Sequence, residues 1–126
     1  MTAPTAAELG DYLEQFARTG KVVAYSDLSD HFRLPKKMPW KDNPLYKLLG
    51  DVTQEDIRAG RPLRISMVVS MKDGKRTIPS DGYFTTIASY RNAQIPDRIA
   101  EKRRIHDREL KTTVAYYGFH GEPSRE

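Results

Sequence analysis

The sequence predicts an α+β fold, and three observations support this prediction. Apolar residues recur at helical spacing in several stretches of the first 60 residues. The spacing changes to strand-like alternation in residues 61–71, and the Asp73-Gly74 pair that follows is typical of a tight hairpin turn. The length of 126 residues suits a single hydrophobic core, so we expect the elements to pack around one centre.

The first helix is expected over residues 5–18. Thr5 and Glu8 have the spacing of a capping box, in which each side chain bonds the backbone N–H of the other residue. Gly20 supplies a natural C-terminal stop. Gly10 lies inside the helix and weakens it by about 1 kcal/mol relative to alanine.

The next elements surround a basic loop. A short β-prone run at residues 21–25 leads to a second helix, which starts at Ser26 and ends before Pro35. Residues 33–44 contain three prolines and four basic side chains, which is typical of a loop. The third helix begins at Asn43 or Pro44, because proline is favoured in the first helical turn, and it stops at Gly50.

After Gly50 the sequence predicts one more short helix and then strands. Thr53 and Asp56 have capping-box spacing, and Gly60 ends the helix that they begin. The strand prediction for residues 61–71 depends on an alternating apolar set, which consists of Leu63, Ile65, Met67 and Val69.

The remaining chain is predicted to return as an edge strand and to end in a helix. Pro79 interrupts the strand that follows the Asp73-Gly74 turn. Residues 82–90 are compatible with a strand or a helix, and Pro96 opens a last helix that reaches about Val114. The order of helix, short strand, helix, loop, helix and β-hairpin predicts a winged helix-turn-helix domain over residues 1–92. Residues 93–126 are predicted to be an appended basic helix with a frayed tail.

Two stretches resemble the alkyltransferase-like DNA-binding domain family. Gly20-Lys-Val-Val-Ala-Tyr-Ser-Asp-Leu-Ser-Asp30 is similar to the valine-rich strand and helix start of that family. Pro62-Leu-Arg-Ile-Ser-Met-Val-Val-Ser-Met-Lys-Asp-Gly-Lys75 is similar to its hydrophobic strand and hairpin, and the resemblance covers about residues 5–90. It implies a small winged-helix scaffold of the kind used on DNA, although a fold does not define a function.

The departure from that family concerns its chemistry. The family places a nucleophilic cysteine in a Pro-Cys-His-Arg box before the Val-Val strand. The corresponding stretch here reads Arg64-Ile-Ser-Met-Val-Val69, and the chain has no cysteine. Alkyl transfer and disulfide formation are therefore excluded, and no residue of a base-flipping pocket is carried over.

Two groups of residues are candidates for nucleic-acid contacts. The first lies in the basic loop and at the start of the third helix, and the second forms the hairpin tip, where cations would meet phosphates. They are Lys36, Lys37, Trp40, Lys41, Asn43, Tyr46 and Lys47 in the first group, and Lys72, Lys75 and Arg76 in the second. Alternatively, the tip is charged because turns face solvent, and Trp40 packs as an apolar plug. The third helix has few side chains that read base edges, so we expect little sequence readout.

The last predicted helix carries much of the positive charge. Residues 1–60 contain eight Lys or Arg against nine Asp or Glu, whereas residues 61–126 contain 13 against eight, which accounts for the net charge of +4. The cations expected to meet a partner are Arg98, Lys102, Arg103, Arg104 and Arg108. This helix could dock on its own domain, pair with a second copy in a homodimer or lie along an acidic partner. It could also be a solvated face with i,i+4 ion pairs such as those available to Glu101 and Glu109.

Enzyme functions receive no support. The three histidines, at positions 31, 106 and 120, lack metal-ligand spacing, and no Gly-x-Ser-x-Gly motif occurs. We therefore expect no enzyme activity, no cofactor and no metal site. No apolar run approaches about 18 residues and the first residues lack a signal-peptide pattern, so we expect a cytoplasmic protein that does not enter membranes.

Two hypotheses follow. The first is a non-enzymatic protein that binds nucleic acid, with double-stranded DNA as the partner. The second is a protein-interaction module, such as a phage or mobile-element inhibitor or adaptor, that binds an acidic protein surface. Binding to DNA would weaken steeply with salt, because each neutralised phosphate releases counterions.

Overall fold

The computed structural model describes residues 4–35, 42–72 and 75–120. Its α-helices are α1 (Ala6–Thr19), α2 (Tyr25–Phe32), α3 (Pro44–Ala59), α4 (Asp81–Arg91) and α5 (Ile99–His120), and a 3-10 helix, η2, covers Arg64–Met67. The strands are β1 (Val23–Ala24), β2 (Val68–Val69), β3 (Met71–Lys72) and β4 (Lys75–Arg76).

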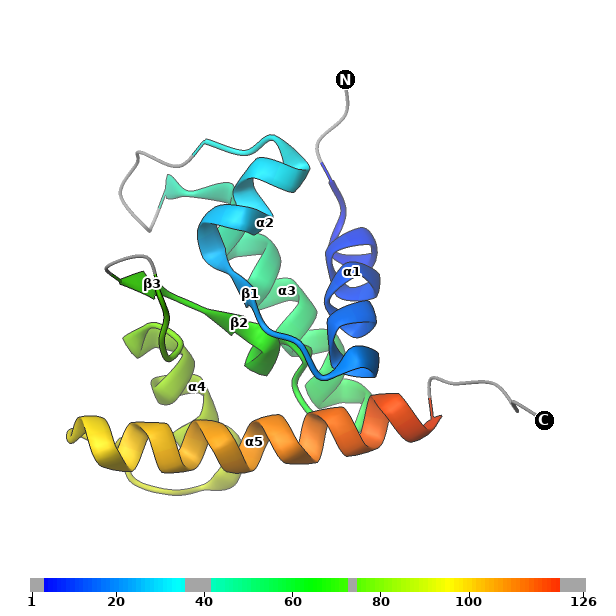
Figure 1. Ribbon diagram of the computed structural model, residues 1–126. Helices are drawn as coiled ribbons and strands as arrows, with labels where there is room; N and C mark the ends of the chain where they lie inside the picture. Colours follow the sequence, from blue (N-terminus) through cyan, green and yellow to red (C-terminus); the bar gives the residue numbers. More distant parts are fainter. Residues whose placement is uncertain (1–3, 36–41, 73–74, 121–126) are drawn as a thin grey trace.

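The helices form two levels around the short strands. In Figure 1, α1, α2 and α3 lie together in the upper part of the molecule, and the long α5 runs beneath them. The strand β1 pairs with β2 in parallel, with Val23 opposite Val68, so it joins the α1–α2 connection to the chain that follows η2. The helix α4 lies between the strands and one end of α5 (Figure 1).

The predicted α+β winged helix-turn-helix is wrong, because helices dominate the fold. In the described ranges β1 pairs with β2 in a two-stranded parallel sheet. The strands β3 and β4 form a separate antiparallel pair. Each strand has two residues, which is too little for the predicted wing. Residues 82–90, whose sequence is compatible with a strand or a helix, belong to the helix α4.

Two local predictions failed for the same reason, which is a buried carboxylate. The helix α3 passes through Gly50 and continues to Ala59, because Asp56 does not cap a new helix. Its carboxylate instead accepts hydrogen bonds from the backbone N–H of Arg64, at 2.9 Å, and from the Arg64 side chain. These bonds draw the chain after Gly60 back onto α3, and residues 64–67 form a fully buried 3-10 helix instead of an alternating strand.

The start of α1 confirms the predicted capping box. The Thr5 hydroxyl accepts from the Glu8 N–H at 3.1 Å, and the Glu8 carboxylate accepts from the Thr5 N–H at 2.8 Å. Gly20 ends the helix with φ of 74°, a left-handed conformation that glycine adopts at little cost. Local sequence therefore determines both ends of this helix.

One main core joins the upper helices, and a smaller cluster attaches α5. The main core combines Leu9 and Leu13 of α1 with Leu28 of α2, and residues of α3 and α4 complete it. The smaller cluster is centred on Ala17, Met67 and Tyr117, with partly buried apolar side chains of α5 packed around it. The helix α5 is therefore held against α1 and η2 along one side.

Candidate nucleic-acid interface

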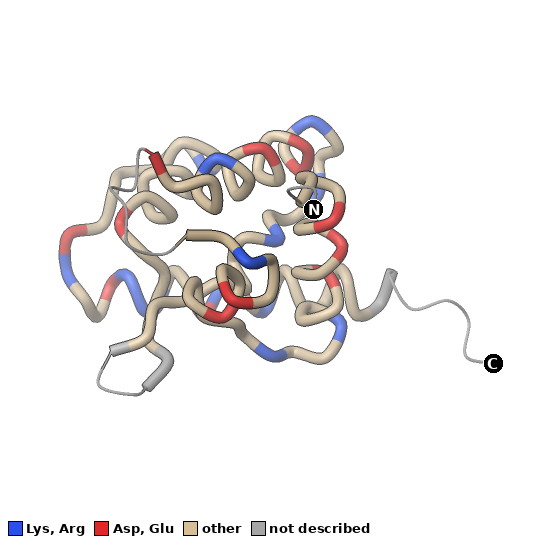
Figure 2. Tube along the Cα trace, turned by 90° about the horizontal axis from the view of Figure 1, so that it is seen from above, with Lys and Arg blue, Asp and Glu red and all other residues tan. Residues whose placement is uncertain are grey.

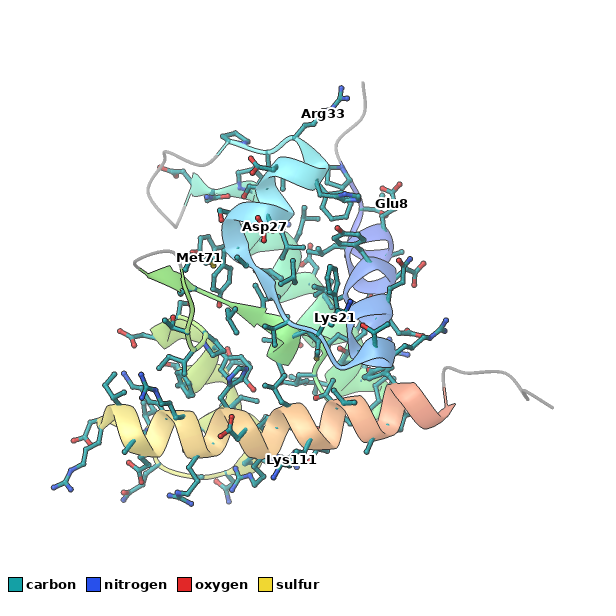
Figure 3. All side chains as sticks on the ribbon, in the orientation of Figure 1. Glu8, Lys21, Asp27, Arg33, Met71 and Lys111 are labelled. Atoms are coloured by element: carbon teal, nitrogen blue, oxygen red, sulfur yellow. The ribbon has the colours of Figure 1, made fainter. Side chains whose placement is uncertain are left out.

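The side of α5 that faces away from the other helices carries a row of cations. We call this surface the outer α5 face; it is a shallow hollow lined by Ala100, Arg103, Arg104, Asp107, Arg108 and Lys111. These positions follow the i, i+3, i+4 spacing of one helical side, and positions 103 to 111 span about 12 Å of helix axis. Figure 3 shows Lys111 below α5, on the side remote from α1 and α3.

The other side of α5 is buried and hydrogen-bonded. The Nε2 of His106 lies 2.8 Å from the carbonyl of Ser66, and the hydroxyl of Tyr117 donates to the carbonyl of Pro62 at 2.8 Å. The Thr113 hydroxyl donates to the carbonyl of Glu109 at 2.7 Å. The bonds of His106 and Tyr117 join α5 to other segments and fix its rotation about its axis, so they also determine that the cationic side faces solvent.

The carboxylate that the sequence places among the cations is turned inward. Glu109 is 1% exposed, and both of its oxygens accept from the guanidinium of Arg91 at 2.9 Å. This bond raises the pKa of Arg91. Arg108 approaches Glu109 only at 3.5 Å and keeps a side chain that is 57% exposed. The outer α5 face is therefore more positive than the alternating sequence indicates.

Asp107 is the one carboxylate that lines the outer α5 face in the described chain. Arg104 lies 3.8 Å from Glu101, a distance at which an exposed pair contributes little. No carboxylate of the described residues lies within 4.0 Å of the Arg103 or Lys111 side-chain nitrogens. Most of the cationic capacity of this surface is thus available to a ligand.

Of the five cations predicted to meet a partner, three lie together on this face: Arg103, Arg104 and Arg108. Lys102 points elsewhere, because its ammonium binds Asp81 at 3.0 Å and lies over the ring of Phe84. Arg98 precedes α5 and is exposed. The prediction omitted Lys111, which the i+3 spacing from Arg108 would have indicated.

The described residues at the start of α3 have separate roles. Asn43 is buried and caps α3, since its side-chain oxygen accepts from the Leu45 N–H at 2.9 Å. The Tyr46 ring stacks on that of Tyr25 with centroids 5.7 Å apart. Lys47 is exposed and lies 3.6 Å from Asp51 in the next turn. These three residues do not form a continuous basic surface.

The other predicted nucleic-acid contacts are not described by the structure. Lys36, Lys37, Trp40 and Lys41 lie outside the described residues, as do the side chains of Lys72, Lys75 and Arg76. Figure 2 shows basic and acidic positions interspersed along the trace, so a net positive charge alone does not locate a site. The outer α5 face is the surface on which described side chains gather several cations.

No group of three or more histidine, cysteine or acidic side chains in the described ranges could hold a metal ion. No described helix combines the length and apolar character needed to cross a bilayer. Comparisons with protein-family models, curated proteins and solved structures found no match.

Proposed function

We propose that this protein binds double-stranded nucleic acid, with DNA as the first partner to test, through the outer α5 face. The observation that carries the proposal is the row of four exposed cations on one side of α5, with a single carboxylate among them. Three of the four are arginines, whose planar guanidinium groups bond phosphate oxygens in pairs. A straight helix with this spacing suits contacts to successive phosphates of a duplex.

We expect the binding to show little preference for the base sequence of the duplex. We assign the arginines of the outer α5 face to phosphate oxygens, and the face contains no asparagine or glutamine side chain to read adenine edges in the major groove. Contacts to phosphate position a protein without reading sequence. We therefore expect similar affinity for duplexes of different sequence and a strong dependence on salt.

The test is fluorescence anisotropy with a labelled duplex of about 20 base pairs, titrated at several salt concentrations. The double substitution Arg103→Ala with Arg108→Ala should weaken binding at least tenfold. It should also reduce the slope of log affinity against log salt concentration by the contribution of about two phosphate contacts.

The control has the same net charge as the variant. Lys21→Ala with Arg58→Ala also removes two exposed cations, but from positions outside the outer α5 face. This control should bind nearly as the parent chain does. Equal weakening of both variants would mean that net charge, and not this face, attracts the duplex. Failure of the parent chain to bind any duplex at low salt would reject the proposal.

A protein partner with an acidic surface is the second candidate, because apolar side chains lie beside the cations. Ile95 and Ile99 are 58% and 54% exposed and flank Arg98. Exposed apolar residues next to arginine are typical of protein interfaces, including those of homodimers. Ile95→Ser with Ile99→Ser should disrupt such a complex, as measured by sedimentation, and should leave duplex affinity unchanged.

A further inference from the structure

A cavity lies on the other side of α4, away from the outer α5 face. It has a volume of about 270 Å³ and lies between α3, α4 and the start of α2. Its floor is apolar and consists of Leu49, Ile65 and Val68, which are buried members of the main core. This volume lies just below the range of roughly 300–1,000 Å³ that is typical of small-molecule sites, so it suits only a small ligand.

None of the described side chains that line this cavity is charged. This is unusual for a chain in which 30% of residues are Asp, Glu, Lys or Arg. An acidic residue, Asp81, lines an adjoining hollow and is bound to Lys102. The surroundings therefore favour an uncharged occupant over an ion, because a charged one would lose hydration without gaining a partner.

Two helical glycines face the cavity, and the folded chain gives no steric reason for them. A Cβ built on Gly50 in α3, or on Gly82 in the first turn of α4, meets no atom within 4 Å. By contrast, Gly10 lies against Arg64, and Gly20 and Gly60 have positive φ. Both glycines are exposed to solvent, and without a side chain each leaves the backbone of its helix accessible at the edge of the cavity.

Aromatic rings form the wall of the cavity beside these glycines. The Tyr25 and Tyr46 rings stack with centroids 5.7 Å apart and an interplanar angle of 30°. The Tyr25 hydroxyl accepts from the Ser80 N–H at 3.1 Å and lies 3.2 Å from the Ser80 hydroxyl, which holds its ring in place. A fixed tyrosine face next to backbone without side chains can accept a flat ring by stacking.

We propose that this cavity binds a small, uncharged, aromatic molecule of about the size of a bicyclic ring. The ligand would stack on Tyr46, rest on Leu49 and Val68, and approach the backbone of α3 and α4 where Gly50 and Gly82 leave room. The proposal is independent of nucleic-acid binding, because no residue of the outer α5 face lines this cavity.

The test is an NMR titration of the full chain with indole as the probe. Indole should shift the backbone amide signals of residues near Gly50 and Gly82. Tryptamine and indole-3-acetate, which add a positive and a negative charge to the same ring, should bind at least tenfold more weakly. Absence of shifts in α3 and α4, or equal or tighter binding of a charged analogue, would overturn the proposal.

Variants that fill the cavity distinguish binding at the proposed site from weak binding elsewhere on the protein. Gly50→Leu should reduce indole affinity at least tenfold while the helix signal in circular dichroism is retained. Gly82→Leu adds a side chain at the opposite wall, and it replaces Gly50→Leu in this test if that variant does not fold. Ala115→Leu, at an exposed position of α5, is the control for adding an apolar side chain and should bind indole as the parent does. Unchanged affinity in a folded Leu variant would overturn the proposal.

Discussion

Two regions that both involve α3 are built in contrasting ways. At the closed junction, which we define as the contact of α3 with α1 and η2, Asp56 is fully buried and Arg64 is 4% exposed. Their side chains are 3.0 Å apart, and Arg61 also donates to Asp56, at 2.6 Å. Along the cavity toward α4, the same helix presents uncharged side chains and leaves space unfilled. The first region holds the fold together, whereas the second is free to accept a ligand.

The helical glycines express this difference most clearly. At Gly10 an added Cβ would lie 2.8 Å from a guanidinium nitrogen of Arg64, which Glu14, Glu55 and Asp56 hold in place. At Gly50 an added Cβ would enter open space. A glycine in a helix can therefore lie in close packing or at the exposed edge of a cavity, and the sequence looks alike in both cases.

The largest effect is expected from Asp56→Ala at the closed junction. This change leaves the buried Arg64 without its main partner, and we expect a loss of about 3–5 kcal/mol in the free energy of unfolding. Urea denaturation measures it. Glu55→Ala removes a partner that is 41% exposed and 3.5 Å away, and it should cost less than about 1 kcal/mol. Similar losses in the two variants would contradict our account of the junction.

The next effect has opposite signs at the two glycines. Gly10→Ala should destabilise the protein by about 1–3 kcal/mol, because Arg64 cannot move aside without breaking its ion pairs. Gly50→Ala should stabilise it by up to about 1 kcal/mol through helix propensity alone. Thermal and urea unfolding of both variants test the comparison directly. A gain in stability at Gly10 would show that the guanidinium has room to shift.

The smallest effect concerns pH and His106, where α5 meets η2. Burial lowers the pKa of His106 below its ordinary value of 6.5, and its ring N–H donates to the Ser66 carbonyl at 2.8 Å. The folded state then binds fewer protons than the unfolded state at mildly acidic pH. The contribution of His106 to the free energy of unfolding should be fully present above about pH 6.5. It should decrease as the pH falls below that value toward the lower pKa of the folded state.

His106→Gln tests this assignment, because glutamine can still donate to the Ser66 carbonyl but does not titrate. The variant should lose less stability than the parent chain between pH 7 and pH 5.5, as measured by urea unfolding at each pH. A parent and a variant with the same pH dependence would remove His106 from the explanation.

The helices were more predictable than the strands, for local reasons. The ends of α1 follow from Thr5, Glu8 and Gly20, which act within a single turn of chain. The strand prediction for residues 61–71 failed because a distant carboxylate, Asp56, binds Arg64 and bends the chain into η2. Alternating apolar residues could not reveal that bond.

The candidate interface was predictable in composition but not in orientation. The cations Arg103, Arg104 and Arg108 are evident in the sequence, and helical spacing puts them near one another. The sequence does not reveal that Lys102 binds Asp81 or that Glu109 binds Arg91, because both partners belong to α4. Contacts across elements thus decide which charges remain exposed.

The sequence alone defines the caps of α1, excludes cysteine chemistry and places the excess of cations in the second half of the chain. Packing between distant segments was needed to join residues 44–59 into one helix, to bury Asp56 with Arg64 and to leave a cavity beside Gly50. The reason is physical. Caps and helical periodicity act over a few residues, whereas buried ion pairs and cavities depend on which distant segments meet.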